Sequence, residues 1–206
     1  MKIVVATQNV AKVMEIKSFF EKAVGRFGRS FCLEVLSLDD LGVTLDLDAV
    51  EDGITFEENA TKKAEAVRLA LGGDVIVLAD DSGLEIDALG GLPGVDSANF
   101  MGRNTLYEAR FEWILSQMGD GPRTACFVAV MALALPDKTV TFRASVEGEI
   151  AHAYTGSKGF GYDPIFYLPE FGKTAAQISM EQKNTISHRG KALQKVVDYL
   201  NENFGI

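Results

Sequence analysis

Two adjacent carboxylates, Asp80 and Asp81, follow the apolar run DVIVLA at residues 74–79. Two like charges beside a buried strand repel each other and lose solvation, which costs stability unless a positive charge compensates. Because Asp, Ser and Gly all favour turns, the stretch DDSG could simply be the turn that ends a strand. A bound cation is the alternative that would give the pair a chemical use.

A second acidic group, Glu51-Asp52-Gly53, stands just before a predicted helix. If this group and the aspartate pair converge, they form an all-oxygen site. Such a site suits Mg²⁺, a hard ion that accepts few carboxylates and keeps water and phosphate oxygens as its other ligands. A metal there would also lower the pKa values of the carboxyl groups.

The polar turn TQNVAK at residues 7–12 leads from a predicted strand directly into a helix. Backbone N–H groups at a helix start can bind an anion, and Lys12 lies close enough in sequence to add a positive charge. Taken alone, this segment could equally be an ordinary strand–helix turn.

The glycine-rich segment TGSKGFGYDP at residues 155–164 does not match standard nucleotide motifs. Its glycines run GxxGxG after a hairpin, unlike the GxGxxG of a strand–helix unit. The stretch FGKT at 171–174 lacks the earlier glycine of a phosphate-binding loop, because position 167 is Tyr167. Phe160, Tyr162 and Asp163 could still clamp a base between stackable rings and a carboxylate. A glycine-rich turn with core aromatics is the structural alternative.

Cations crowd the start of the last predicted helix, where the helix dipole favours anions. His188 and Arg189 follow Ser187, a residue suited to the N-cap, Lys191 comes two positions later, and Lys183 lies upstream. Either these are solvated surface charges, or phosphate or carbonyl oxygens of a substrate meet this end of the helix.

The elements expected to position these groups alternate between strands and helices in the first half of the chain. Strands are predicted at residues 2–6, 31–37, 74–79 and 84–89. A helix after the first strand shows Val13, Ile16, Phe20 and Val24 at helical spacing, and a second at 55–71 opens with the capping box Thr55–Glu58.

A third helix is predicted from the capping box Thr105–Glu108, with Tyr107, Phe111, Ile114, Leu115 and Met118 facing inward. A long antiparallel hairpin at 124–135 and 139–151 and a helix from about 188 to 203 complete the chain. Together these elements predict a mixed α/β fold in a single domain covering residues 1–206.

Composition narrows the function classes. The chain has 206 residues, of which 47% are hydrophobic, so it can form a substantial core. Its net charge of −9 disfavours non-specific binding to nucleic acid or anionic membranes. No apolar run reaches the length of about eighteen residues needed for a transmembrane helix, and the N-terminus reads as a strand. Cys32 and Cys126 lie in apolar stretches without metal-like spacing, so we expect reduced core thiols and a cytoplasmic protein.

Five stretches, in this order, resemble the inosine triphosphate pyrophosphatase family: TQNVAK, EDGITFEENATKKA, LADDSGLEIDALGGLPGVDSA, FGYDPIF and GKTAAQISMEQKNTISHRGKAL. The resemblance implies an α/β fold with a mixed, long central sheet and two lobes flanking a nucleotide-binding cleft. It implies a Mg²⁺-dependent homodimer that hydrolyses the non-standard purine nucleotides ITP, dITP and XTP to the monophosphate and pyrophosphate.

The resemblance also implies roles for individual residues. Asp81 would be the catalytic base, and Glu51 and Asp81 would bind Mg²⁺, with Asp80 supporting them. Substrate would contact Thr7, Gln8, Asn9, Val10, Ala11, Lys12 and Lys63 on the phosphate side, and Phe160, Gly161, Tyr162, Asp163, Lys183, His188 and Arg189 on the base side. Ser82 would also contact substrate. Gln8, Asn99 and Lys158 depart from the residues common in the family.

The 6-keto group gives the base-side donors a physical rationale. Hypoxanthine and xanthine present an acceptor at position 6, whereas adenine presents a donor that would face the donors of Arg189 or His188. One unpaired buried polar group costs about 1–3 kcal/mol, which gives roughly tenfold to over a hundredfold selection. The alternatives to this function are a Mg²⁺-dependent phosphohydrolase of different base preference and a nucleotide sensor without turnover.

Overall fold

The computed structural model describes residues 1–27 and 33–205, and Cys32 lies outside these residues. The described strands form a sheet in the order β2-β1-β3-β4-β5-β6-β7. Strand β1 (Lys2–Ala6) pairs in parallel with β2 (Glu34–Ser37) and β3 (Ile76–Ile86). Strand β6 (Phe166–Leu168) pairs antiparallel with β5 (Thr139–Ile150) and β7 (Lys173–Thr174). The sheet is therefore mixed, which confirms the predicted α/β class.

The chain divides into two compact units, and strands β3, β4 (Thr124–Ala134) and β5 contribute to both. Unit 1 consists of Met1–Asp81, Ala129–Ala144 and Arg189–Ile206, and unit 2 of Ser82–Val128 and Ser145–His188. Each unit has its own hydrophobic core. The prediction of a single domain stays a prediction.

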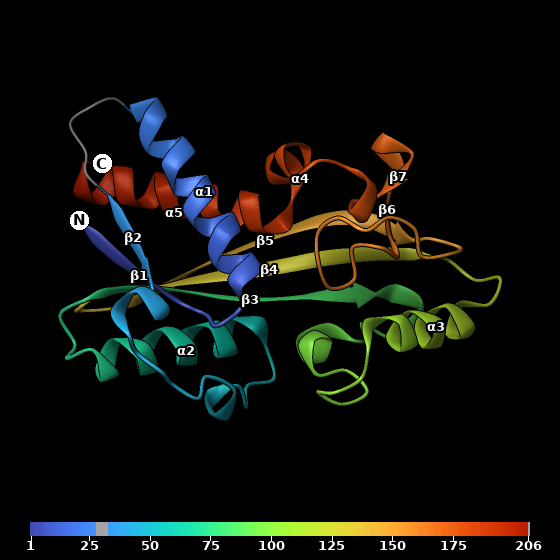
Figure 1. Cartoon of the computed structure of the whole chain (residues 1–206), viewed down its shortest axis with the longest axis horizontal. Coiled ribbons are helices and arrows are strands. Elements are labelled where there is room, and N and C mark those ends of the chain that lie inside the picture. Colours follow the sequence, from blue (N-terminus) through green and yellow to red (C-terminus); the bar gives the residue numbers. More distant parts are fainter. Residues whose placement is uncertain (28–32, 206) are drawn as a thin grey trace. The chain divides into compact units, whose positions relative to one another are not determined.

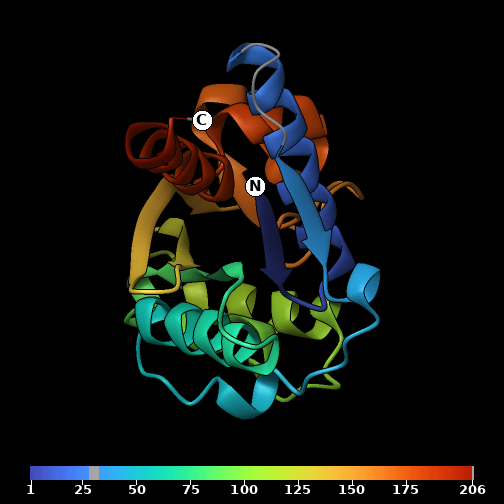
Figure 2. The same ribbon diagram turned by 90° about the vertical axis from the view of Figure 1, so that its left-hand side faces the viewer.

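Unit 1 has helices on both faces of its strands. Helices α1 (Val10–Phe27) and α5 (His188–Phe204) cover one face, and α2 (Phe56–Ala70) covers the other (Figures 1 and 2). The apolar stripes of α1 and α5 pack on the strands through Ile16, Phe20, Leu193, Val196 and Leu200, all almost fully buried. Of the stripe predicted for α1, Ile16 and Phe20 are buried and Val13 is half-buried, while the side chain of Val24 lies outside the described residues.

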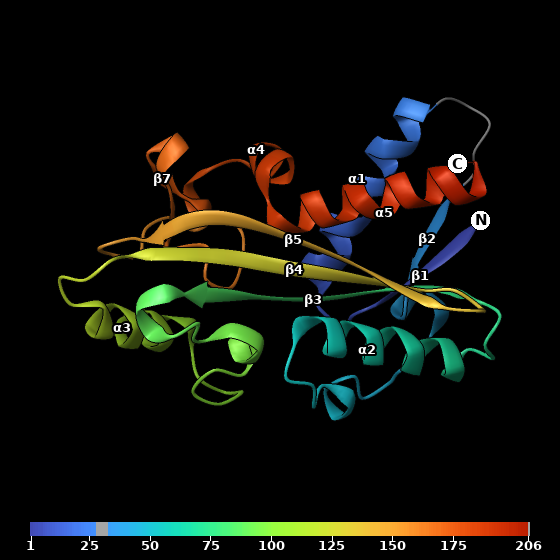
Figure 3. The ribbon, with the colours of Figure 1, turned by 180° about the vertical axis from the view of Figure 1, so that it is seen from behind.

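Unit 2 places α3 (Tyr107–Met118) and α4 (Met180–Ile186) on opposite sides of its strands (Figure 3). Phe111, Ile114 and Met118 of α3 are buried, as predicted, but 36% of Tyr107 is exposed and Leu115 is half-buried. Helix α4 was not predicted, since seven residues are too few for a clear apolar period.

The two capping boxes predicted from sequence have different outcomes. Thr55 caps α2, with its hydroxyl oxygen accepting from the Glu58 N–H, while Glu58 accepts from the N–H of Ile54 instead of Thr55. The Thr105–Glu108 box is wrong. The Thr105 hydroxyl donates to the Met101 carbonyl, and α3 follows an N-cap at Leu106 without a side-chain bond. A local partner for the hydroxyl therefore replaced the cap.

Strand β3 corrects the reading of the aspartate pair. The predicted strands 74–79 and 84–89 are largely one continuous strand, Ile76–Ile86, followed by a 3₁₀ turn at Asp87–Leu89. Asp80 and Asp81 therefore lie inside a strand and not in a turn at its end. The later hairpin is as expected, with β4 and β5 neighbours in the sheet and the Leu135 N–H donating to the Lys138 carbonyl.

Candidate functional site

The strand geometry at Asp80 and Asp81 explains how two adjacent carboxylates are accommodated. Successive side chains of a strand point to opposite faces of the sheet. Asp80 meets Lys12 of α1 and Arg189 of α5, and Asp81 meets Lys63 of α2. These partners come from helices on opposite faces of the unit 1 strands, as Figure 1 shows. Each carboxylate thus has its own cationic environment.

Asp80 is the centre of a buried ionic cluster. Its Oδ1 lies 2.5 Å from Lys12 Nζ and its Oδ2 accepts from Arg189 Nε at 2.9 Å, while Arg189 Nη1 donates to Glu15 Oε2 at 2.6 Å. Burial alone would raise the pKa of Asp80, but the charges and hydrogen bonds of Arg189 and Lys12 outweigh it and hold the pKa far below its usual range. Asp80 is therefore a fixed negative charge at neutral pH.

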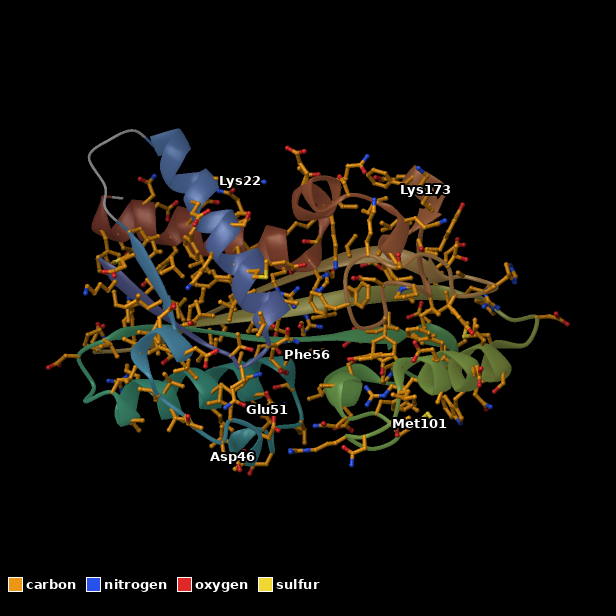
Figure 4. The ribbon with its side chains drawn as sticks, in the orientation of Figure 1. Lys22, Asp46, Glu51, Phe56, Met101 and Lys173 are labelled. Atoms are coloured by element: carbon orange, nitrogen blue, oxygen red, sulfur yellow. The ribbon has the colours of Figure 1, made fainter. Side chains whose placement is uncertain are left out.

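Asp81 belongs to a second cluster, which is centred on an ammonium group. Lys63 Nζ donates to Asp81 Oδ1 at 2.8 Å and lies 2.5 Å from Glu51 Oε1. It also donates to the carbonyl of Asp80 at 2.9 Å. Glu51 lies in the segment that leads into α2 (Figure 4). From the sequence, an all-oxygen site was expected only if the two acidic groups converge. Glu51 and Asp81 do converge, within unit 1.

Burial and charge act against each other at this pair. Burial raises the pKa of Asp81 even though the Lys63 and Lys12 charges lower it. For Lys63, burial lowers the pKa, but Asp81 and Glu51 together raise it above its usual value. The lysine therefore stays protonated, and Asp81 accepts a proton more readily than an exposed aspartate does.

One carboxylate oxygen of this cluster is buried without a hydrogen bond to any residue that the structure describes. Asp81 Oδ2 is buried and has no hydrogen-bond partner among the described residues. A buried unsatisfied acceptor is costly, and an absent ligand is one explanation for it. Within the described part of the chain, no group of three or more His, Cys, Asp or Glu side chains could hold a metal. Two carboxylates with a free oxygen nevertheless fit Mg²⁺, which commonly takes only one or two protein carboxylates.

The turn after β1 is organised by its own side chains. Asn9 Oδ1 accepts from the N–H of Lys12, and Thr7 Oγ1 accepts from the N–H of Asn9. Gln8 donates to the Leu45 carbonyl at 2.7 Å, so this family departure ties the turn to a neighbouring loop. The exposed residues Gln8, Asn9 and Val10 and the half-buried Ala11 surround the start of α1. The turn thus remains accessible at the end of the helix that favours anions.

The predicted base-side residues of unit 2 also form a cluster. Asp163 Oδ2 accepts from Lys183 Nζ at 2.6 Å and from the N–H of Phe160 at 2.8 Å. The Lys183 ammonium lies 4.8 Å from the centre of the Phe160 ring, within range of a cation–π contact. Phe160 is half-buried, whereas Asp163 and Lys183 are buried. The reading of Lys183 as a solvated surface charge is therefore wrong.

Tyr162 and His188 are part of the packed interior of unit 2. The Tyr162 hydroxyl donates to the Ser97 carbonyl at 2.9 Å, and burial raises the pKa of Tyr162 to about 12. The His188 ring stacks on Phe127, with centroids 4.9 Å apart and planes at 21°. His188, Lys183 and Asp163 border a cavity of about 10 Å³, room for about one water molecule.

Gly159 allows the Asp163 carboxylate to approach the loop. Its φ is +72°, and a Cβ there would stand 2.0 Å from Asp163 Oδ2. We expect Gly159→Ala to displace this carboxylate, which loosens Lys183 and costs about 1–3 kcal/mol for the strained backbone and the disrupted buried pair. Urea unfolding measures the loss. Gly90→Ala is the control, since it has a similar φ of +63° but nothing within 4 Å. Equal losses in both variants would contradict the steric argument.

Sequence reasoning missed two buried charges. Glu15 completes the Arg189 cluster, and it carried no signal beyond its position three residues after Lys12. Arg110 is 1% exposed and donates to the carbonyls of Ser97, Ala98 and Gly102. Its spacing from Ile114 and Met118 placed it on the apolar stripe of α3, and that signal was available in the sequence. Arg110 holds the same Ser97 carbonyl that receives the Tyr162 hydroxyl.

Comparison with known proteins decides the family. The model of the Ham1 family matches residues 3–199. This chain belongs to the Ham1 family. It is 41% identical over 208 residues to a dITP/XTP pyrophosphatase of Clostridium perfringens, with 97% of each chain covered. It is 43% identical over 201 residues to a dITP/XTP pyrophosphatase of Staphylococcus aureus, with 97% of this chain and 96% of the relative covered.

A solved structure agrees with this family assignment. The Ham1 protein of Staphylococcus aureus superimposes with a TM-score of 0.83 at 41% identity, covering 98% of this chain and 99% of its own. The resemblance stated from the sequence motifs is thereby confirmed, as is the fold class. Among the described residues, no helix is both long and apolar enough to cross a bilayer.

Proposed function

We propose that this chain is a nucleoside triphosphate pyrophosphatase that hydrolyses ITP, dITP and XTP to the monophosphate and pyrophosphate. The observation that carries the proposal is identity above 40%, over nearly the whole chain, to relatives named dITP/XTP pyrophosphatase. On the family resemblance we also propose that the protein is cytoplasmic and forms a homodimer. Light scattering after size-exclusion chromatography tests the dimer.

The charge arrangement of unit 1 supports this reaction. Glu51 and Asp81 are suited to hold Mg²⁺, and the buried Asp81 Oδ2 is the oxygen that lacks a partner among the described residues. When bound, Mg²⁺ would supply charge neutralisation at the triphosphate oxygens. Lys12 and Lys63 supply further positive charge, and the start of α1 supplies backbone donors for phosphate.

Asp81 is the group proposed to take the proton from the attacking water. In the metal-free protein burial raises its pKa, so its carboxylate takes up a proton there more readily than an exposed aspartate does. Attack at the α-phosphorus breaks the bond to the bridging oxygen between the α and β phosphorus atoms. Pyrophosphate then departs with the negative charge that Lys12 and Lys63 stabilise.

Unit 2 supplies the proposed base contacts. The half-buried Phe160 offers a ring for stacking, and Lys183 is a fixed donor beside it. Gly161, Tyr162 and Asp163 shape the adjoining loop, and Ser82 follows Asp81 directly in β3. The contact of Arg189 with the base stays a prediction. In the described structure its Nε, Nη1 and Nη2 donate to Asp80 and Glu15.

We expect Phe160→Ala to raise the KM for ITP by roughly tenfold to a hundredfold, since stacking of a base on an aromatic ring contributes about 1–3 kcal/mol. Steady-state kinetics with ITP measures the change. Phe142→Ala in unit 1 is a control that removes another partly buried ring. A KM for ITP that is unchanged in Phe160→Ala would remove this residue from the proposed base contact.

The test of the function itself is a substrate panel. Pure protein with Mg²⁺ is incubated with ITP, XTP, dITP, GTP and ATP, and pyrophosphate and orthophosphate are measured separately. We expect pyrophosphate from the first three and little product from GTP and ATP. Release of orthophosphate, or preference for another base, would identify a different phosphohydrolase. Binding without turnover would identify a nucleotide sensor.

A further inference from the structure

Lys63 stands where a cation shared by Glu51 and Asp81 would be expected. Its ammonium nitrogen contacts Glu51 Oε1, Asp81 Oδ1 and the Asp80 carbonyl at 2.5, 2.8 and 2.9 Å. Three oxygens around one positive centre, all within unit 1, resemble part of the coordination shell of a hard cation. The lysine side chain is almost fully buried, so it holds this position inside the protein.

The charges of this cluster are incompletely balanced by the ammonium. Two carboxylates carry two negative charges and Lys63 supplies one positive charge, while Asp81 Oδ2 has no partner among the described residues. A divalent cation would balance both carboxylates. The ammonium and such a cation cannot share the same oxygens, because like charges a few ångströms apart in a poorly solvated site repel strongly.

We propose that Lys63 is an internal placeholder for the metal, an inference that rests on the proposed function. Without ligands, its ammonium holds the Glu51 and Asp81 carboxylates together. With a divalent cation on these carboxylates, the ammonium would pair instead with oxygens of the triphosphate. Lys63 thus positions the metal ligands in one state and neutralises substrate charge in the other.

This exchange couples metal binding to nucleotide binding. Displacing the ammonium from two carboxylates is unfavourable unless phosphate oxygens receive it. Metal and triphosphate therefore each bind better when the other is present, and the coupling is reciprocal. The metal-free protein meanwhile avoids two adjacent uncompensated carboxylates, the buried Asp81 and the partly exposed Glu51, whose repulsion would destabilise unit 1.

The first test measures Mn²⁺ binding without nucleotide, by electron paramagnetic resonance. We expect Lys63→Met to bind Mn²⁺ about tenfold to a hundredfold more tightly than the wild type, because the competing positive charge is gone. Lys62→Met is the matched control. It removes the neighbouring lysine of α2, which is exposed and pairs with the exposed Asp52, and should bind Mn²⁺ like the wild type. Equal or weaker binding by Lys63→Met would overturn the proposal.

The second test is thermal unfolding with and without Mg²⁺. Lys63→Met should have a lower Tm than the wild type in the absence of metal and should regain stability with Mg²⁺. The wild type and Lys62→Met should respond little to Mg²⁺ alone. Lys63→Gln, which keeps hydrogen-bond donors without the charge, serves as a second variant with the same expectation. If Mg²⁺ raised the Tm of the wild type by as much as it raised the Tm of both Lys63 variants, the placeholder role would be refuted.

Both readouts are independent of turnover. Pyrophosphate release from ITP by the wild type tests the proposed function, whereas metal binding and stability in the absence of nucleotide test the placeholder. If the wild type is active but all variants bind Mn²⁺ equally, the proposed function is supported and the placeholder role of Lys63 is refuted. If the wild type is inactive but the variants show the expected metal response, the proposed function is refuted and the placeholder role is supported.

Discussion

Replacing Asp81 by asparagine should lower kcat for ITP hydrolysis by about a hundredfold to ten-thousandfold, the usual contribution of a positioned general base. The variant keeps the size of the side chain but removes the proton acceptor and a charged metal ligand. Pyrophosphate release with saturating ITP and Mg²⁺ measures the loss. If Asp81→Asn kept wild-type kcat, the assignment of the base would be wrong.

The fold of Asp81→Asn should survive. Because burial raises the pKa of Asp81, the folded protein disfavours the charge that asparagine removes. Lys63 also keeps Glu51 and the Asp80 carbonyl as partners. Asp52→Asn is the control for loss of a carboxylate nearby. Asp52 adjoins Glu51 but is exposed and pairs with Lys62, so this variant should retain full activity.

The titration of Asp81 in the metal-free protein provides a second readout of the same residue. Burial raises the pKa of Asp81 above the ordinary value of 3.8, and the charge of Lys63 opposes this rise. In metal-free Lys63→Met the pKa of Asp81 should therefore lie higher than in the wild type, which an NMR titration of the carboxyl group measures. A lower pKa of Asp81 in this variant would contradict the buried ion pair.

Much of the fold could be predicted because the apolar periodicity of unit 1 is regular. The helical spacing of Ile16 and Phe20 identified α1 and its buried face, the capping residue Thr55 located the start of α2, and β1 was expected at residues 2–6. The continuity of β3 could not be predicted locally. Asp and Gly disfavour strands and Ser favours turns, yet ion pairs with Lys12, Arg189 and Lys63 compensate the two carboxylates within this extended segment.

The contacts within the candidate site were likewise only partly predictable from the sequence. Carboxylates and lysines could be chosen from their types and order, but the residue that faces each of them depends on which helix covers which side of a strand. Glu15 could not be found for this reason, since its partner Arg189 lies far along the chain in α5. Thr105 could not be judged either, because the competing Met101 carbonyl is set by the turn around Gly102.

The largest effect on stability should come from Arg189→Met. Arg189 is 2% exposed and pairs with Asp80 and Glu15, so its loss leaves two buried carboxylates with a diminished set of partners. Breaking a buried ionic cluster in this way typically destabilises a protein by about 3–5 kcal/mol. Urea unfolding followed by circular dichroism measures the change. Arg143→Met is the matched control: this arginine of unit 1 pairs with Glu57 at the surface, and its loss should cost less than about 1 kcal/mol.

The pH dependence of Arg189→Met separates a charge effect from a packing effect. In the wild type the pKa of Asp80 is depressed, so its stabilisation is present above the unfolded pKa of about 3.9 and is lost as pH falls below it. Without Arg189 the largest opposing charge is gone and Lys12 remains to counter burial, so the pKa of Asp80 rises from its wild-type position and protonation relieves the variant as pH falls. The stability difference between wild type and variant should therefore shrink as pH falls from neutral through the unfolded pKa of about 3.9 and below it. A difference that stays constant over that interval would show that Arg189 stabilises the protein through packing and not through its charge.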